Sequence, residues 1–383
     1  MKDDVLAGLI SPTPVDELLA RPWPGELLVT HGAGNLAREL GEIPTLASPL
    51  ALLAHCRRAG RGLSRDGLTE QRSARPQDLR RWYEEGKLVS FNRAECEVVE
   101  LTPYLRRLEA QLGLRFGDIS CQILVGQPGA GVEGHFDSTP TFHLQVHGTK
   151  RWRLAPNTAV TNPPAGMMLG SATPRSIARC MREPIPTRMP PTSSEVVAHA
   201  GTTIFLPLGL LHETEAATES LAVLFTLDPK SHAKNVLQRI EATLSTAAEW
   251  RAPAIGVAPR DAVTRAATRA RLEELLADLR GQVNALTADA LLEAWSENPP
   301  ARMQLADGLS LVVEAEEVPF VILRFATRER RLAIAAGHVD VYRWLARATG
   351  TFDLREATWA AGDDAAHVLE RLRELGLVVD APR

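Results

Sequence analysis

The spacing of hydrophobic residues changes along the chain and divides it into regions. Over roughly the first hundred residues, short apolar runs such as VDELLA and PQDLRRWYEEG recur near helical spacing, which predicts a helical lead-in. From Leu88 onward, short runs rich in β-branched and aromatic residues are bounded by Gly, Pro, Asn and Asp, which predicts the strands of a sandwich or barrel. Between Pro156 and Pro191 little periodicity remains, and a connection of that length is typical of a lid or a substrate loop.

Beyond Pro229 the pattern turns helical and then mixed. Runs such as NVLQRIEATLSTAAEW are rich in good helix formers. Two β runs, a predicted helix RLAIAAGHVDVYRWLARAT, a second helix and a closing strand follow, an order typical of a winged helix-turn-helix. Because single cores stop growing at roughly 250 to 300 residues, we expect an α+β chain of three domains: residues 1–230 with the β-rich core, residues 231–300 all helical, and residues 301–383 as the winged helix.

The composition excludes several classes of protein. With 45% hydrophobic and 23% charged residues the chain is typical of soluble globular proteins, and a formal net charge of −4 provides no field that attracts nucleic acid or an anionic membrane. No apolar run approaches the roughly 20 residues of a membrane span, and the N-terminus lacks the form of a signal peptide. The four cysteines are scattered without a CxxC pair, which favours a cytoplasmic protein over a zinc ribbon or a disulfide scaffold.

A possible metal site is the sharpest chemical signal. In the segment GHFD, His135 and Asp137 are two residues apart, so in a strand they project from the same face and can bind one ion. A second histidine, His212, follows the predicted strand TTIFLPLG and precedes another, SLAVLFTLD. Two histidines and one carboxylate form the ligand set of the non-haem Fe(II) oxygenases, which keeps coordination positions open for reactants.

In such sites a 2-oxoglutarate co-substrate needs a cation for the carboxylate that lies far from the iron. Lys150 begins the strand that returns beside TFHLQVH, and a lysine binds a carboxylate end-on as a point charge. The polar residues of TFHLQVH alternate with apolar ones, so we expect their shared face to line the cavity. Thr141 would add a hydroxyl to the same carboxylate, and His143 and Gln122 would contact co-substrate or substrate. The alternatives are a solvent-facing Thr141 and Gln122 and, as the favoured interpretation, a hydrogen-bonded His143 on a polar barrel face.

The run GHFDSTPTFHLQVHGTKRWRL and the later AGTTIFLPLGLLHETEA together resemble the JmjC class of cupin oxygenases, in particular its ribosomal oxygenase branch. The resemblance covers nearly the whole chain, because that branch joins a double-stranded β-helix to a helical dimerisation domain and a C-terminal winged helix. It implies Fe(II) held by His135, Asp137 and His212 and 2-oxoglutarate anchored by Lys150. It also implies hydroxylation of a protein or peptide side chain, with succinate and carbon dioxide as the other products.

The substrate and the role of the winged helix are less sharply indicated. Where the family often has Tyr between the first two ligands and Arg in the later Pro-x-Gly turn, this chain has Phe136 and Leu208, and the less polar approach weighs against a ribosomal-protein substrate. The alternatives are a hydroxylase of a free amino acid or natural-product intermediate, and a non-catalytic cupin that serves in binding or regulation. The last predicted helix, DDAAHVLERLRELG, has more acidic than basic residues, so we expect no nucleic-acid partner. The apolar content of the helical segment favours a homodimer.

Overall fold

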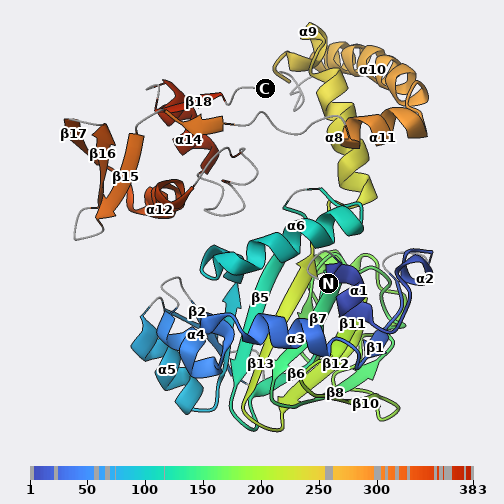
Figure 1. Ribbon diagram of the computed structural model, residues 1–383. Helices are drawn as coiled ribbons and strands as arrows, with labels where there is room; N and C mark the ends of the chain where they lie inside the picture. Colours follow the sequence, from blue (N-terminus) through green and yellow to red (C-terminus); the bar gives the residue numbers. More distant parts are fainter. Residues whose placement is uncertain are drawn as a thin grey trace. The chain divides into compact units, whose positions relative to one another are not determined.

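The chain folds into two compact units, Met1–Pro229 and Lys230–Arg383 (Figure 1). The division into three domains remains a prediction, and the boundary expected between residues 300 and 301 lies outside the described residues. The computed structural model describes residues 4–20, 25–55, 60–64, 70–73, 75–115, 117–254, 262–296, 303–306, 309–314, 319–325, 328–348, 352, 357, 365–374 and 377–380.

The first unit is built around two antiparallel sheets, which confirms the β-rich core. The larger sheet has the strand order β1-β11-β7-β13-β5-β4-β2-β3, and the smaller has the order β10-β8-β12-β6-β9. The strands of the larger sheet are β1 (Leu28–Thr30), β2 (Gly60–Leu63), β3 (Glu70–Ser73), β4 (Leu88–Asn92), β5 (Ile119–Gly126), β7 (Thr141–His147), β11 (Thr203–Leu206) and β13 (Ser220–Leu227). Those of the smaller sheet are β6 (Gly131–Phe136), β8 (Lys150–Ala155), β9 (Met167–Met168), β10 (Ser194–Ala198) and β12 (Leu211–Ala216).

The two sheets face a shared interior. The central strand β13 lies between β7 and β5 and is buried along nearly its whole length, as expected for a strand that is covered on both faces. Across the interior, His143 of β7 meets Trp152 of β8 edge to face, with ring centroids 4.6 Å apart. Side chains of both sheets line one cavity of about 550 Å³. The cavity therefore lies between the sheets, where polar side chains from several strands can converge.

Helices pack around the strands of the larger sheet (Figure 1). They are α1 (Val5–Ile10), α2 (Val15–Leu19), α3 (Gly34–Gly41), α4 (Pro49–His55), α5 (Pro76–Glu84) and α6 (Thr102–Gln111). The expectation of a wholly helical lead-in is wrong, because β1, β2 and β3 extend the two ends of the sheet. Glycines allow β2 to approach α5 closely: an added Cβ would lie 2.8 Å from Leu79 at Gly60 and 2.7 Å from Trp82 at Gly62. The opposite face of β2 is therefore turned toward the interior between the two sheets.

The long connection between β8 and β10 has more local structure than its sequence indicates. It contains β9, which pairs with β6 opposite His135 and Phe136, and the short helix α7 (Arg175–Ala178). A hydrophobic cluster fixes the connection to the smaller sheet. The buried members of this cluster are Phe136, Ala155, Val160, Met167, Ile177, Met189 and Leu211. One residue of the connection, Met168, reaches the cavity, and a lid function for the segment remains a prediction.

The second unit begins with helices and ends with short strands and helices. Its elements are α8 (His232–Leu244), α9 (Ala248–Arg251), α10 (Ala262–Asn284), α11 (Ala288–Ser296), β14 (Met303–Leu305), β15 (Leu309–Glu314), β16 (Phe320–Phe325), β17 (Arg328–Ala333), α12 (Val339–Arg347), α14 (Ala365–Glu374) and β18 (Val378–Asp380). The helix predicted from RLAIAAGHVDVYRWLARAT is partly wrong: its first residues belong to β17, which pairs with β16, and α12 begins only at Val339. Over the described part of the chain, no helix combines the length and the apolar character that crossing a membrane requires.

Candidate functional site

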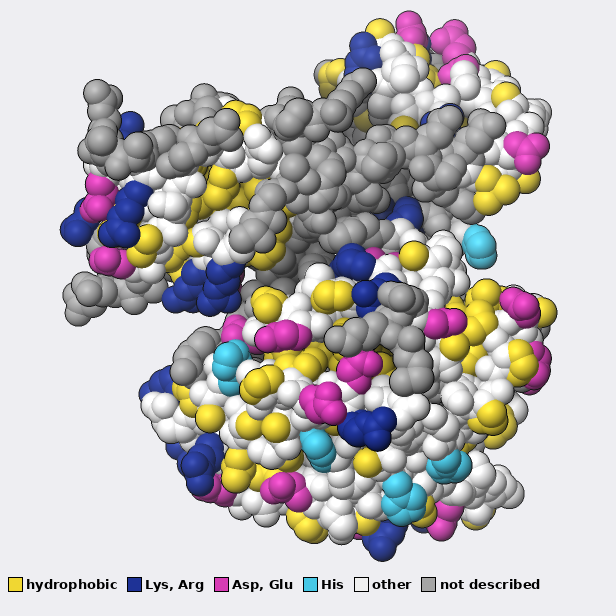
Figure 2. Space-filling model, viewed as in Figure 1, with side chains coloured by type: hydrophobic (Ala, Val, Ile, Leu, Met, Phe, Trp, Pro, Cys, Tyr) yellow, Lys and Arg dark blue, Asp and Glu magenta, His cyan; other side chains and the backbone are white. Residues whose placement is uncertain are grey.

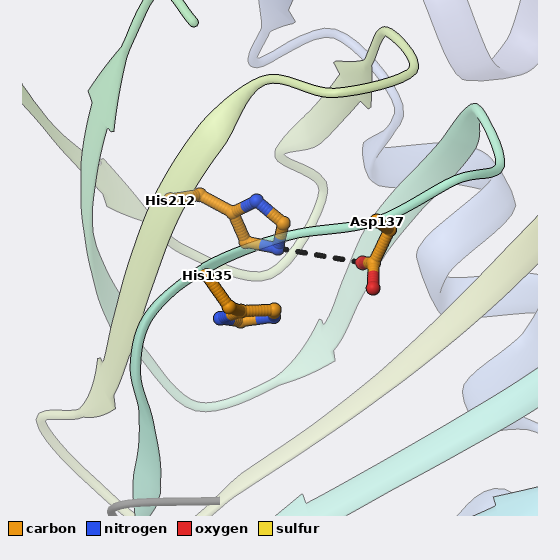
Figure 3. Close-up of side chains that lie close together, drawn as sticks. All are labelled: His135, Asp137 and His212. Carbon is orange, nitrogen blue, oxygen red and sulfur yellow. Dashed lines mark ion pairs between the residues drawn. The ribbon is translucent and has the colours of Figure 1, made fainter. Parts of the chain in front are cut away.

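Three side chains that can hold a metal ion come together in the cavity between the sheets. His135, Asp137 and His212 offer ligand atoms that all lie within 4.8 Å of one another (Figure 3). The Nε2 atom of His212 lies 3.6 Å from an Asp137 carboxylate oxygen, and the two imidazole rings have centroids 4.1 Å apart. His212 is buried, whereas 54% of the Asp137 side chain is exposed. The group is therefore accessible from one side, as a reactive centre must be.

The two histidines meet because they are direct partners on neighbouring strands, His135 on β6 and His212 on β12. The next pair in the ladder is Thr214 with Val132, so β6 advances by three residues where β12 advances by two. Such a β-bulge re-aims side chains, and Val132 and His135 consequently both line the cavity although they are an odd number of positions apart. Next to the bulge, Gly131 lets the strands approach closely, since a Cβ there would lie 1.9 Å from the carbonyl oxygen of Thr214.

Each histidine is oriented by the backbone that precedes it. Nδ1 of His135 lies 2.8 Å from the carbonyl oxygen of Glu133, and Nδ1 of His212 lies 2.9 Å from that of Leu210. A carbonyl oxygen only accepts, so both Nδ1 atoms carry the proton and both Nε2 atoms present a lone pair. Burial and the neighbouring His135 lower the pKa of His212 to about 4, although Asp137 opposes the shift. His212 is therefore neutral near pH 7, which is the state that a metal ligand requires.

Lys150 places a buried cation in the same cavity. It begins β8, is 1% exposed, and has its Nζ atom 5.9 Å from the ring centre of Trp152. Burial lowers the pKa of Lys150 to about 8, and no described carboxylate lies near enough to oppose this shift. A buried ammonium group without a counter-charge is costly, so the cavity is suited to an anionic ligand that approaches this lysine.

His143 is a second buried polar group that lacks a partner. It is 2% exposed, and neither of its ring nitrogens has a hydrogen-bond partner among the residues that the structure describes. Burial, and to a smaller extent the neighbouring Lys150 and His212, keeps the pKa of His143 well below its usual range. The described residues thus provide no partner for the favoured prediction of a hydrogen-bonded histidine, which stays a prediction. A neutral imidazole with one donor and one acceptor lines the cavity.

The remaining predicted contacts divide into two groups. Thr141 and Gln122 line the cavity, whereas Gln145 and His147 do not. The Gln145 amide donates to the carbonyl of His147 at 2.7 Å, and the His147 ring is hydrogen-bonded to the carbonyl of Leu46 at 2.8 Å. The prediction that the whole polar face of β7 lines the cavity is therefore wrong: the Gln145 amide is bonded to the backbone, and His147 lies beyond a shift of register in the pairing of β7 with β13.

The polar lining residues that sequence reasoning missed include Arg61, Asn92 and Arg93. Arg61 lies on β2, within the stretch interpreted as a helical lead-in, and Asn92 ends β4. The run GRGL contains a usable signal, because glycines alternating with larger residues are typical of a strand whose backbone is closely approached on one face. The pairing that brings β2 beside β4 is long-range and has no comparable local signal.

Comparisons with known proteins found one similar curated sequence and several similar solved structures. Over 301 residues the chain is 25% identical to the uncharacterized protein YxbC of Bacillus subtilis (strain 168), a match that spans 76% of this chain and 91% of YxbC. Among solved structures it is similar to YcfD, a ribosomal oxygenase from Escherichia coli, at 14% identity and a TM-score of 0.45 over 97% of this chain and 99% of that chain. A complex of YcfD with cobalt and 2-oxoglutarate matches at 14% identity and a TM-score of 0.43 over the same shares.

The family model described as the JmjC domain matches residues 114–235. This range contains the three grouped side chains His135, Asp137 and His212 and the buried Lys150. The match confirms the resemblance indicated by the sequence motifs. Residues 114–235 therefore match the JmjC domain, and the candidate site lies inside this range.

Proposed function

We propose that the protein is an Fe(II)- and 2-oxoglutarate-dependent oxygenase that hydroxylates its substrate. The observation that carries the proposal is the presence, in one cavity, of a two-histidine, one-carboxylate group and a buried lysine without a described carboxylate partner. A site for metal alone would not need the lysine. A site for an anion alone would not need the triad, that is, His135, Asp137 and His212. Together they fit a metal-bound dicarboxylate whose second carboxylate is held by Lys150.

His135, Asp137 and His212 would hold the iron, and the chemistry of this donor set fits that ion. When bound, iron and 2-oxoglutarate supply the oxidising chemistry that inserts an oxygen atom from dioxygen into a carbon–hydrogen bond. The chain itself aims the two Nε2 lone pairs, because both Nδ1 protons are bonded to backbone carbonyls. Trp152, 2% exposed and with its ring centroid 6.0 Å from that of His212, excludes water behind the triad.

Lys150 would bind the carboxylate of 2-oxoglutarate that lies far from the metal, and Thr141 would add its hydroxyl. We expect His143 to donate a further hydrogen bond to this carboxylate, since its ring lies near Lys150 and has no hydrogen-bond partner in the described part of the chain. Replacing His143 by Phe keeps the packing against Trp152 but removes the donor, and it should raise the dissociation constant of 2-oxoglutarate about tenfold. Calorimetry with the Co(II)-loaded protein measures this change. An unchanged constant would remove His143 from the co-substrate pocket.

Co-substrate binding should also depend on pH. The pKa of Lys150 is lowered to about 8 by burial, so the ammonium form that binds a carboxylate predominates below this pH and is progressively lost above it. We expect the affinity for 2-oxoglutarate to be level from pH 6.5 to 7.5 and then to fall by up to about tenfold per pH unit above 8. Titrations of wild type and Lys150→Arg, whose guanidinium remains charged, test the assignment. An equal decline in both proteins would trace the effect to another group.

We propose a side chain of a protein or peptide as the substrate, with a free amino acid or natural-product intermediate as the runner-up. Support comes from the accessible side of the cavity, where Asn92 and Asp137 are exposed and Arg61 and Arg93 are partly exposed. A side chain can enter there while the backbone that carries it stays outside. The volume of about 550 Å³ accommodates a co-substrate and one such side chain.

The experiment that tests the function is succinate formation by anaerobically purified protein given Fe(II), 2-oxoglutarate and oxygen. We expect slow turnover without substrate, and loss of turnover in His135→Ala. Arg151→Ala is the matched control for nonspecific effects of a substitution on the purified protein, since Arg151 lies on the outer face of β8 with 65% of its side chain exposed. If wild type neither turns over nor binds 2-oxoglutarate in the presence of metal, a binding or regulatory cupin is the better description.

We also propose that the protein forms a homodimer through its helical segment. Large hydrophobic side chains are exposed on α10, among them Leu272 (47%) and Leu276 (44%), one helical turn apart, and Figure 2 shows hydrophobic side chains at the surface of this part of the chain. Replacing both leucines by Glu should convert a dimer to a monomer in sedimentation velocity. Leu50→Glu, at an exposed leucine of the first unit, is the control. A monomeric wild type would contradict the prediction.

A further inference from the structure

The cavity has two halves, which are lined by different strands. Thr141 and His143 of β7 and Lys150 of β8 line the half in which we place the co-substrate. Strands β5, β4 and β2 follow one another in the larger sheet, and β6 and β9 are neighbours in the smaller. Because β5 ends at Gly126 and β6 begins at Gly131, a short turn joins these two groups of strands on one side of the cavity. A substrate that reaches the triad while the co-substrate is bound has to use this second half.

Apolar side chains from five strands line the second half of the cavity. They are Leu63 of β2, Leu88 of β4, Leu124 of β5, Val132 of β6 and Met168 of β9. Register places Leu63 beside Leu88. Leu88 is buried, whereas the other four side chains are partly exposed. Apolar surface that faces a cavity in this way is stabilised when a ligand removes it from water.

This apolar lining reaches the triad. Met168 is the register partner of His135, and Val132 lines the cavity on the other side of the bulge in β6. Met168 has a flexible and polarizable side chain, which adapts to apolar groups of different shape. An apolar group that contacts Val132 and Met168 would therefore lie beside the metal ligands.

Polar side chains on β2, β4 and β5 line the same half but are bonded to one another. The Asn92 carbonyl oxygen accepts from Nη2 of Arg61 at 3.1 Å and from the Gln122 amide nitrogen at 2.9 Å. The same Gln122 nitrogen donates to the hydroxyl of Ser90 at 2.8 Å, so both of its hydrogens are used. Arg61 and Arg93 also interact with other groups of the chain. Since these groups already have partners, the apolar side chains have more to gain from a ligand.

We propose that the substrate carries an aliphatic group of about the size of a leucine side chain, and that this group binds among Leu63, Leu124, Val132 and Met168 beside the triad. The proposal rests on the oxygenase function and names the class of its substrate. Full burial of such a group strengthens binding by roughly 10- to 150-fold, whereas an amide or ammonium group buried there would lose its bonds to water. The aliphatic group can belong to a peptide residue or to a free amino acid.

The test uses probes that differ in polarity but hardly in shape, added to protein that holds Co(II) and saturating 2-oxoglutarate without oxygen. One arm compares the peptides Ac-Ala-Leu-Ala-NH2, Ac-Ala-Asn-Ala-NH2 and Ac-Ala-Lys-Ala-NH2, and the other compares free leucine with free asparagine. We expect the leucine probe to bind at least about tenfold more tightly than the polar probes in at least one arm, as measured by ligand-detected NMR titration. The arm that responds distinguishes a peptide from a free amino acid.

Variants of nearly unchanged shape then assign the preference to the apolar lining. Val132→Thr and Leu124→Asn should each reduce the leucine-to-asparagine affinity ratio by at least about threefold. Val197→Thr is the matched control, because Val197 is the partner of Arg151 on the outer face and is 43% exposed; it should leave the ratio at the wild-type value.

Three results would overturn the proposal: no leucine preference in either arm, tighter binding of the asparagine or lysine probe, or a wild-type ratio in both Val132→Thr and Leu124→Asn. Binding of 2-oxoglutarate is measured in every sample before the probes are added. Its loss in a variant identifies a damaged site, and its absence in wild type registers failure of the oxygenase function separately.

Discussion

Replacing Lys150 by Met is expected to weaken 2-oxoglutarate binding by at least about 100-fold, the loss that typically follows removal of one partner from a buried ion pair. The side chain is 1% exposed, so its positive charge is little screened by water. Without it, the far carboxylate of the co-substrate would be buried with no opposing charge. Methionine is similar in length and apolar, so the cavity keeps its shape while the charge alone is removed.

Calorimetry with Co(II)-loaded protein provides the measurement, and succinate formation should fall in parallel at subsaturating co-substrate. Arg151→Met is the matched control, because Arg151 precedes the next inward residue of the same strand and its ion pair with Glu215, at 3.8 Å, is exposed. Metal affinity should be unchanged in both variants. If Lys150→Met binds 2-oxoglutarate as wild type does, the buried lysine has another purpose and the co-substrate lies elsewhere.

Removing a triad ligand should have a comparably large effect on metal binding. His212→Ala leaves two ligands of three, and the affinity for Fe(II) or Co(II) should fall by well over about 100-fold, more than the 10- to 100-fold that loss of an outer hydrogen-bond partner costs. Because metal binds only the folded protein at this site, wild type should gain about 2.7 kcal/mol of stability at a metal concentration of 100 times the dissociation constant. The variant should gain almost none.

Competition with a chromophoric chelator measures the affinity, and thermal unfolding with and without Co(II) measures the gain in stability. His199→Ala is the control histidine, since His199 is exposed beyond the end of β10. Asp137→Ala should behave as His212→Ala does. Wild-type metal affinity in either triad variant would mean that the ion binds outside the group formed by His135, Asp137 and His212.

The sequence allowed the grouping of His135, Asp137 and His212 and the presence of Lys150 in the same cavity to be predicted, because local spacing and strand context were informative. His135 and Asp137 are near neighbours, and His212 and Lys150 each begin or adjoin a clear β run. The position of Arg61 in the lining of the cavity was not predictable in this way. Arg61 reaches it only because β2 pairs with β4, a contact between short strands whose glycine-rich sequence carries little periodicity. His147 was wrongly predicted to line the cavity. Side chains alternate between the two faces of a strand only where the pairing is regular, and the pairing of β7 with β13 shifts register at this point.

The bulge in β6 has a consequence for how related sequences are compared. Val132 and His135 both line the cavity although they are three positions apart, because β6 has one residue more than β12 between the two pairs. In a regular ladder, residues three positions apart project from opposite faces. A relative without the bulge would therefore need a spacing of two between these positions to keep both side chains in the cavity. An alignment of related sequences should accordingly allow a gap of one residue in β6 immediately before the histidine.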